Sequence, residues 1–335
     1  MSAASPARVP APGVGRNGYR GRSAPSPSGW LHLGNARTAL VAWLRARQSG
    51  GGLTLRIDDL DAPRTVPEAV SGNLAELRWL GLDWDEGEDV GGPHGPYRQS
   101  LRGERYALAL ERLEAGGAVY ECYLSRKELH AIASAPHARA PVYGEAERRA
   151  NAAVAALRRA EGRAASQRLR VDPGEIRFRD ALAGPQRFVV GRDLGDIVLR
   201  RSDGVWAYQL ATVVDDAAMG VTEVVRGDDL LPSTAIQLVL FRALGLAAPG
   251  YLHVPLLLDA AGKRLSKRGG SDTLHELKAA GVPPERVVGL LAYGLGLLPE
   301  PRPATPPELL ERFDLAAVST APAYLDHAQL AWLGA

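Results

Sequence analysis

The order of the predicted elements between residues 22 and 80 constrains the fold more strongly than any other feature of this sequence. Arg22–Ala24 has the pattern of a short strand that stops at Pro25, and apolar residues at helical spacing predict a helix over 35–48. A second strand over 53–57 and a second helix over 67–80 follow. Because strands that alternate with helices are typical of parallel sheets, we expect an α/β fold with a doubly wound parallel sheet.

The rest of the chain continues this pattern and divides into regions. We expect a disordered tail over 1–18, a main domain whose halves span 19–102 and 188–270, an inserted α+β subdomain over 103–187, and a short helical C-terminal region over 271–335. Within these regions the residue patterns predict helices over 104–115, 145–163 and 230–244, and strands over 120–122, 197–199, 206–214 and 221–225.

Composition excludes some classes of protein. The 335 residues include one cysteine, Cys122, so neither an intrachain disulfide nor a cage of several thiolates can form. No apolar run approaches the roughly 18 residues that a membrane span needs. Residues 1–17 are rich in Ala, Pro and Gly and lack the apolar core of a secretory signal. We therefore expect a cytoplasmic protein with no membrane segment.

The charge of the chain is nearly balanced, at +2, but arginines recur between residues 148 and 201. Such a surface could contact nucleic-acid phosphates. It could equally be a solvated face in an arginine-rich protein, and the sequence leaves both interpretations open.

The first candidate motif is His32-Leu33-Gly34-Asn35, where a loop rich in Pro and Gly meets the first predicted helix. The start of a helix exposes unpaired N–H groups and the positive end of its dipole, which suits a phosphate. Gly34 lacks a Cβ and permits close approach of a flat ligand, and His32 could donate a hydrogen bond to a phosphate oxygen. A purely structural histidine is the alternative.

The second candidate motif is the basic loop 263–270, which follows an apolar run over 253–258. A dense cluster of Lys and Arg that ends in two glycines can fold over a polyphosphate, with Lys267 as a point charge. Taken alone, it could be any exposed basic loop.

Together, the two motifs resemble the HIGH-type and KMSKS-type motifs of class I aminoacyl-tRNA synthetases, in the same order and context. Other segments resemble the glutamyl branch of that class: its opening at 22–39, its acidic loop at 55–61 with Arg64, and its later strands at 208–216 and 225–230. The resemblance covers residues 19–272 without a large gap. It implies a Rossmann-like catalytic domain.

The resemblance implies activation of glutamate by ATP with Mg²⁺, followed by transfer of the glutamyl group to a tRNA. Catalysis would consist of positioning and charge stabilisation, without a covalent enzyme intermediate. The implied residues are His32 and Lys267 at the phosphates, Gly34 and Asn35 at ATP, Arg22 and Arg226 at the distal carboxylate of glutamate, Asp58 at its α-ammonium, and Tyr208, Ala24 and Ser26 at its remaining contacts.

Several of these residues also have structural interpretations. Arg22 could simply begin a strand, Tyr208 could be a core aromatic residue, and Arg226 could pair with Asp228 or Asp229. The carboxylates at 58–61 could suggest a metal site, although Arg56 and Arg64 flank them.

The chain resembles a truncated branch of the family, the glutamyl-queuosine tRNA(Asp) synthetases. These resemble the catalytic half alone and attach glutamate to queuosine in the anticodon of tRNA(Asp). We expect this function, with a monomer and tRNA(Asp) as partner. A truncated glutamyl-tRNA synthetase that charges the 3′ end, and a non-catalytic paralogue that binds nucleotide or RNA, are the alternatives.

The sequence departs from the family pattern at two places. The family carries a zinc site made by a Cys-x-Cys pair and a later Tyr-x₃-Cys, whereas Leu124 and Glu147 replace two of those cysteines here and leave Cys122 and Tyr143. One thiolate, one phenol and one carboxylate make a poor zinc cage, so we predict no zinc. The family also has Glu where Asp58 stands.

Overall fold

The computed structural model describes residues 18–125, 127–128, 142–259, 261–262 and 273–334. The predicted disordered tail, apart from residue 18, and the basic loop with Lys267 lie outside the described residues. Within the described part, every helix falls short of the length and apolarity that crossing a bilayer requires.

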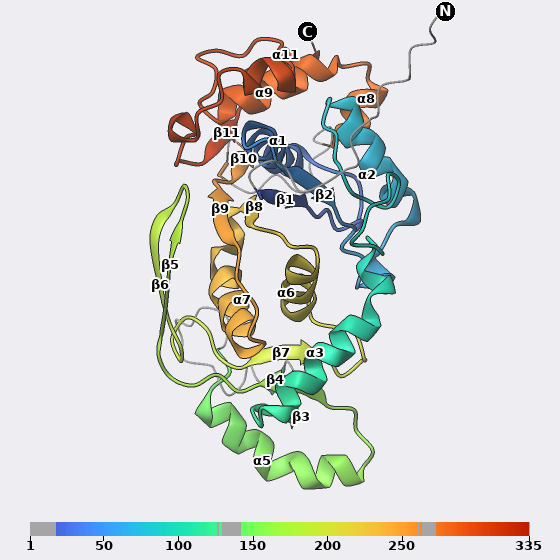
Figure 1. Cartoon of the computed structure of the whole chain (residues 1–335), viewed down its shortest axis with the longest axis vertical. Coiled ribbons are helices and arrows are strands. Elements are labelled where there is room, and N and C mark those ends of the chain that lie inside the picture. Colours follow the sequence, from blue (N-terminus) through green and yellow to red (C-terminus); the bar gives the residue numbers. More distant parts are fainter. Residues whose placement is uncertain (1–17, 126, 129–141, 260, 263–272, 335) are drawn as a thin grey trace, which may run out of the picture.

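A parallel sheet forms the centre of the main domain (Figure 1). Strand β1 (Arg20–Ser23) pairs in parallel with β2 (Gly52–Leu55), and β8 (Glu223–Gly227) pairs in parallel with β9 (Gly250–Val254). The backbone N–H of Thr222 donates to the carbonyl of Arg20 over 2.8 Å, which places β8 beside β1. The strand order β2-β1-β8-β9 confirms the predicted α/β fold with a parallel sheet.

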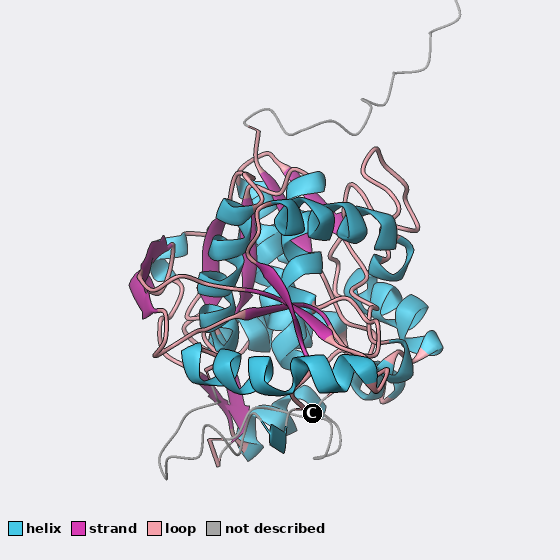
Figure 2. Cartoon of the chain, turned by 90° about the horizontal axis from the view of Figure 1, so that it is seen from below, coloured by secondary structure: helices cyan, strands magenta, loops and turns pink. Residues whose placement is uncertain are grey.

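Helices cover both faces of this sheet, and helices surround the strands in the view of Figure 2. The helix α1 (Leu33–Gln48) packs on one face, where it meets Val225, and α7 (Leu231–Ala243) lies on the other face, with α6 (Tyr208–Ala218) against it. The helix α2 (Pro67–Trp79) follows β2 as predicted. Short 3₁₀ turns complete the main domain at η1 (Ala62–Arg64), η2 (Gln99–Leu101) and η3 (Asp228–Leu230).

The strand predicted over 206–214 is wrong, because most of this segment lies in the helix α6. Every residue from Leu210 to Asp216 is buried, so burial along this segment follows neither the period of a strand nor that of a helix. A short apolar run does not by itself distinguish the two periods, and here the packing of α6 against α7 decides.

The inserted region forms the far end of the molecule, below the sheet in Figure 1. The helix α3 (Gly103–Ala115) leads to an antiparallel sheet of β3 (Val119–Cys122), β4 (Ser166–Leu169) and β7 (Ile197–Arg200), with α5 (Glu145–Ala160) beside it. A hairpin of β5 (Glu175–Asp180) and β6 (Gly184–Val189), which the sequence analysis did not predict, returns to the main sheet. There the N–H of Ala181 donates to the carbonyl of Tyr251 over 2.8 Å.

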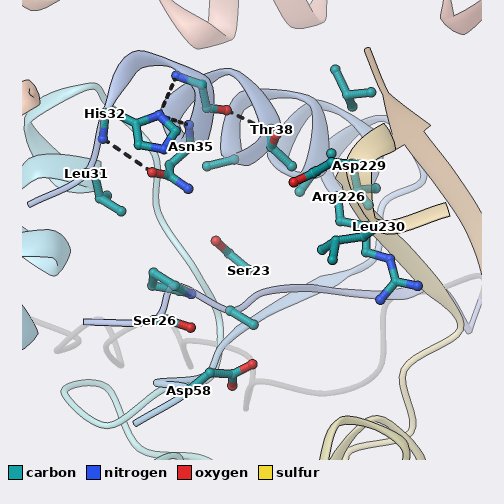
Figure 3. A pocket seen from close by; sticks show the side chains of 18 of the residues that line it. Ser23, Ser26, Leu31, His32, Asn35, Thr38, Asp58, Arg226, Asp229 and Leu230 are labelled. Atoms are coloured by element: carbon teal, nitrogen blue, oxygen red, sulfur yellow. Dashed lines mark hydrogen bonds between the residues drawn. The ribbon is translucent and has the colours of Figure 1, made fainter. Parts of the chain in front are cut away.

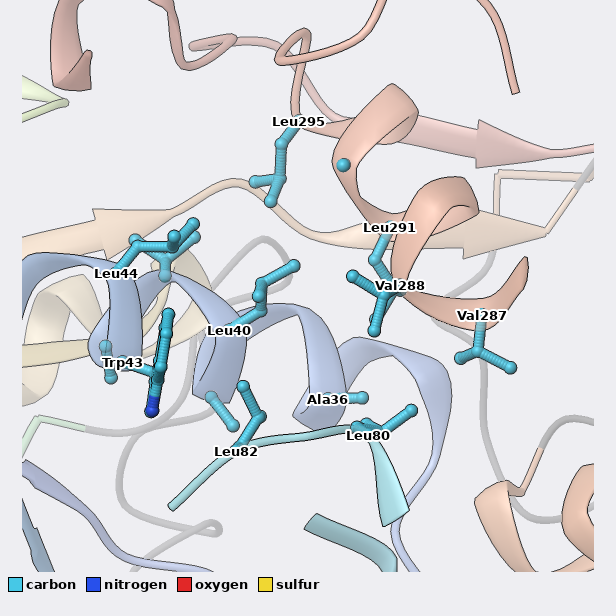
Figure 4. Close-up of a cluster of buried hydrophobic side chains, with 14 of the residues drawn as sticks. Ala36, Leu40, Trp43, Leu44, Leu80, Leu82, Val287, Val288, Leu291 and Leu295 are labelled. Carbon is cyan, nitrogen blue, oxygen red and sulfur yellow. The ribbon is translucent and has the colours of Figure 1, made fainter. Parts of the chain in front are cut away.

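The C-terminal region packs on α1. It contains α8 (Leu274–Ala279), α9 (Pro284–Gly294), α10 (Pro306–Leu310), η4 (Leu315–Ala317) and α11 (His327–Gly334). Leu291 and Val288 of α9 lie over Leu40 of α1 in one apolar cluster (Figure 4). The expectation of a purely helical region needs a correction, since β11 (Ala323–Leu325) pairs in parallel with β10 (Leu257–Asp259).

Candidate active site

A cavity of about 450 Å³ opens where β1, β8 and β9 end. The carboxyl ends of parallel strands are the usual place for a ligand in an open α/β sheet. The lining includes every predicted site residue that the structure describes: Arg22, Ala24, Ser26, His32, Gly34, Asn35, Asp58, Tyr208 and Arg226 (Figure 3). Lys267, the remaining one, lies outside the described residues.

His32 caps the first helix of the sheet. Its Nδ1 accepts hydrogen bonds from the backbone N–H groups of Gly34 and Asn35, over 3.1 and 3.3 Å, and its own N–H donates to Asn35 Oδ1 over 3.3 Å. A nitrogen that accepts these bonds carries no proton, so the neutral ring holds its proton on Nε2. The cap therefore selects a tautomer with one N–H donor.

Gly34 makes this cap possible. A Cβ on Gly34 would lie 3.0 Å from both Cε1 and Nδ1 of His32, closer than ordinary van der Waals contact. The sequence analysis explained Gly34 by the approach of a ligand, and the structure adds the room that it leaves for the imidazole ring.

Arg37, which the sequence analysis missed, ties α1 to the segment before the basic loop. This buried guanidinium donates to the carbonyls of Pro255, Leu256 and Gly294 over 2.7, 3.1 and 2.9 Å. An arginine among the apolar residues of a helix was the only local signal. After the loop, Leu274 N–H donates to Leu31 O over 2.8 Å. Both described flanks of the Lys267 segment are thus attached to the region around His32.

Two buried guanidinium groups lie on the opposite wall of the cavity. Arg22 is 5% exposed and Arg226 is 4% exposed. Arg22 donates from Nη1 to Val225 O over 2.9 Å, and its Nε lies 3.7 Å from Asp216. Arg226 donates to His253 and Thr234, rather than to Asp228 or Asp229. Among the described residues, Arg22 Nε and Arg226 Nη1 have no hydrogen-bond partner.

A buried cation with an N–H that makes no hydrogen bond is costly, because burial disfavours the charged form. Burial is the main cause that lowers the pKa of Arg226, and the nearby charge of Arg22 lowers it further. An arginine nevertheless stays charged in a protein. A ligand carboxylate in this cavity would satisfy both groups, because a guanidinium matches a carboxylate in charge and shape.

Asp58 belongs to a buried ionic network under the cavity floor. Arg56, with no exposed side-chain surface, lies 2.8 Å from Asp58, 2.6 Å from Asp216 and 3.9 Å from Asp215. Burial raises the pKa of Asp58 to about 6, although Arg56 opposes the shift. The acidic pair of the 208–216 motif therefore supports the site from below, a role that needed the three-dimensional structure.

Tyr208 is 38% exposed and stands at the cavity wall, so the core interpretation is wrong for this residue. It also lines a second cavity of about 710 Å³, which shares Ser26, Ser28 and Asp58 with the first. The second cavity extends to Ser125 and Arg168 of the insertion. Two adjoining spaces thus meet at Tyr208.

The residues at the degenerate zinc position contact one another and their neighbours. Cys122 Sγ lies 3.2 Å from the hydroxyl of Tyr143, and a carboxylate oxygen of Glu147 accepts the N–H of Gly144 over 2.7 Å. Asp196 joins the surrounding elements, because it accepts from Tyr120, Arg148 and the N–H of Val171. Among the described residues, no group of three or more His, Cys, Asp or Glu is placed to hold a metal.

Many of the recurring arginines have acidic neighbours. Examples are Arg149 with Glu145, Arg159 with Glu121, and Arg177 with Glu175. Local pairing of this kind favours a solvated face over a dedicated phosphate-binding surface.

Comparison with known proteins places these features in a family context. Residues 19–332 match the family model described as tRNA synthetases class I (E and Q), catalytic domain. A Glutamyl-Q tRNA(Asp) synthetase of Symbiobacterium thermophilum is 55% identical over 305 residues, which cover 90% of this chain and 94% of the relative. Glutamate–tRNA ligase 1 of Halorhodospira halophila is 45% identical over 91% of this chain and 64% of its own length.

A solved structure supports the same relationship. The glutamate tRNA ligase of Elizabethkingia meningosepticum, determined in complex with its amino acid, superposes with a TM-score of 0.80 at 30% identity. The match covers 94% of this chain and 68% of that chain.

Proposed function

The chain belongs to the class I tRNA synthetase (E and Q) catalytic-domain family, and from that premise we propose that it activates L-glutamate with ATP and transfers it to queuosine in the anticodon of tRNA(Asp). The observation that carries the glutamate assignment is the pair of buried arginines, each with an N–H that makes no hydrogen bond to the described residues. Identity of 49–55% to three relatives named Glutamyl-Q tRNA(Asp) synthetase supports the choice of acceptor.

In the proposed complex, the distal carboxylate of glutamate binds between Arg22 and Arg226. Each charge-assisted hydrogen bond there is worth about 1.5–3 kcal/mol, so two of them separate glutamate from glutamine by orders of magnitude. Asp58 receives the α-ammonium and Tyr208 adds its hydroxyl, while Ala24 and Ser26 line the floor. These assignments place the α-carboxylate on the side of the cavity that faces His32.

The first step is then attack of the α-carboxylate of glutamate on the α-phosphate of ATP, which releases pyrophosphate and leaves glutamyl-adenylate. The Nε2–H of His32 donates to the phosphate oxygens as their charge grows, with Gly34 and Asn35 beside the nucleotide. Lys267 supplies a second positive charge, and Mg²⁺ arrives with ATP. Zinc has no part in the proposal, because the residues present do not fit it.

The second step is attack of a tRNA hydroxyl on the activated carbonyl, which releases AMP. The larger cavity suits the incoming nucleoside, because it meets the glutamate cavity at Tyr208 and Asp58 and extends to the insertion. Its lining combines Trp206, which can stack on a base, with Arg168. We propose that the chain acts in the cytoplasm as a monomer.

The test supplies the protein with ATP, Mg²⁺ and radiolabelled glutamate. Parallel reactions contain tRNA(Asp) with queuosine, tRNA(Asp) without it, or tRNA(Glu), and label is counted in acid-precipitated RNA. Label confined to tRNA(Asp) with queuosine is the expected result. Label on tRNA(Glu) would instead identify a glutamate–tRNA ligase, a function that the 45% identical relative makes a definite second candidate.

Substitutions in the candidate active site test whether the labelling of tRNA depends on that site. Lys267→Ala should abolish labelling, whereas Lys278→Ala, at an exposed position of α8, should leave it unchanged. Arg226→Gln should abolish it as well, with Arg242→Gln at an exposed position of α7 as the matched control. Absence of both label and pyrophosphate release with the unaltered protein would leave the non-catalytic interpretation.

A further inference from the structure

Arg226 is hydrogen-bonded to a buried series of side chains. The Nε–H of Arg226 donates to Nε2 of His253 over 3.1 Å, and Nδ1 of His253 lies 2.6 Å from Asp180 Oδ2. The side chains of His253 and Asp180 have no exposed surface. We propose that His253 and Asp180 are positioning residues that aim Arg226 at the distal carboxylate of glutamate and so determine its discrimination from glutamine. This inference rests on the proposed function.

The hydrogen bonds determine the proton positions in this series. An arginine only donates, so Nε2 of His253 must be the acceptor and is unprotonated. The ring proton then resides on Nδ1 and is donated to the carboxylate of Asp180. Thr234 fits the same pattern, because its oxygen accepts from Arg226 Nη2 over 2.7 Å and lies 3.1 Å from His253 Nε2. The donor and acceptor of each of these hydrogen bonds are therefore consistent with a neutral His253.

This arrangement leaves Nη1 of Arg226 without a hydrogen bond to the described residues. The Nε–H and one Nη2–H of the guanidinium are used by His253 and Thr234, on the same side of the group. Nη1 is buried and has no hydrogen-bond partner in the described part of the chain. The remaining edge, formed by Nη1 and Nη2, is the fork that grips a carboxylate bidentately.

The imidazole also separates Asp180 from Arg226. A carboxylate in direct contact would occupy the guanidinium and compete with the substrate. With His253 between them, Asp180 bonds to the imidazole instead of the guanidinium, and the Nη1 side of Arg226 carries no hydrogen bond from the described residues. A carboxylate that orients a histidine, which in turn orients a third group, is a common way to hold a functional side chain in place.

Asp180 is itself held in place, and it comes from the inserted region. It ends β5, and its Oδ1 accepts the N–H groups of Leu182 and Ala183 over 3.0 and 2.8 Å and that of His253 over 3.2 Å. The hairpin therefore reaches from the insertion to β9 of the main domain, the strand that carries His253 (Figure 1). In this inference, the insertion takes part in choosing the amino acid.

Two substitutions of His253 separate its two nitrogens. The oxygen of Gln can stand near Nε2 and accept from Arg226, whereas the amide of Asn reaches only the position of Nδ1. His253→Gln should keep the KM for glutamate close to the original value. His253→Asn should raise it by about 10-fold or more, the loss of one charge-assisted hydrogen bond. Asp180→Asn should raise the KM as well, and Asp172→Asn, at an exposed position, is its control.

The assay is pyrophosphate exchange in the presence of tRNA, with glutamate, glutamine and ATP each varied. The expected pattern is a raised KM for glutamate, with kcat and the KM for ATP within about twofold, and a matching fall in the glutamate-to-glutamine ratio of kcat/KM. That ratio is measured within one sample, so it does not depend on the fraction of folded protein. An unchanged ratio in both His253→Asn and Asp180→Asn would overturn the inference. An unaltered protein that does not activate glutamate would instead overturn the proposed function.

Discussion

Substitution of His32 can separate its structural and chemical roles, because the two ring nitrogens serve different purposes. Nδ1 caps α1 through two accepted hydrogen bonds. His32→Ala removes this cap, which should cost about 1 kcal/mol of unfolding free energy and lower Tm by about 2 °C. Asn is among the best N-cap residues, so His32→Asn should keep most of the stability.

Both variants lack the Nε2–H that we propose donates to the phosphates. Loss of one such donor costs about 2.7–4 kcal/mol of transition-state stabilisation, or about 10²- to 10³-fold in kcat. The two variants should therefore differ in stability and be equally deficient in glutamate activation. Thermal unfolding by circular dichroism and pyrophosphate exchange measure the two effects on the same preparations.

Each outcome has a clear meaning. Activity of His32→Asn close to the original would show that the imidazole acts only as a cap. Equal Tm values for His32→Ala and His32→Asn, both below the original, would show that the cap energy was misassigned.

Three further predictions concern other parts of the molecule. Because burial raises the pKa of Asp58 to about 6, this carboxyl is ionised above that pH and neutral below it. The KM for glutamate should therefore rise as the pH falls through about 6. A steady-state pH profile of this KM that is equally steep in Asp58→Asn would contradict the prediction. Leu291→Ala, in the core over α1, should cost about 2–5 kcal/mol in denaturant unfolding, whereas Leu157→Ala, at an exposed position, should stay within about 0.5 kcal/mol. A chelator should not change the thermal midpoint, while Asp196→Asn should lower it by several degrees; a chelator-induced drop would indicate a bound metal.

Much of the main domain was predictable because its signals are local. Pro25 follows the end of β1, and the glycines at 50–52 follow the end of α1. The loop before His32 predicts the start of a helix. Each boundary therefore follows from a few adjacent residues. The candidate site was predictable for the same reason, since its motifs are short and follow particular strands. The predicted site residues that the structure describes do line one cavity.

One element was misassigned from the sequence and another was missed. The apolar run at 206–214 fits a buried strand or a helix equally well, and only its packing against α7 makes it α6. The hairpin of β5 and β6 was missed although Gly184-Pro185 between its strands is a turn signal, and Gly184 has a φ of 70°. Its contact with the distant strand β9 has no local signal.

The sequence alone determined the class of fold, the family resemblance and the residues that line the candidate site. Only the tertiary structure decided how those residues are held. Asp180 and His253 are 73 residues apart, and His253 and Arg226 are 27 apart. No pattern of neighbouring residues predicts such a contact, because the contact forms only when the insertion folds back onto the sheet. A local motif can specify which side chain faces a ligand, but the direction in which a buried guanidinium points depends on groups that the whole chain brings together.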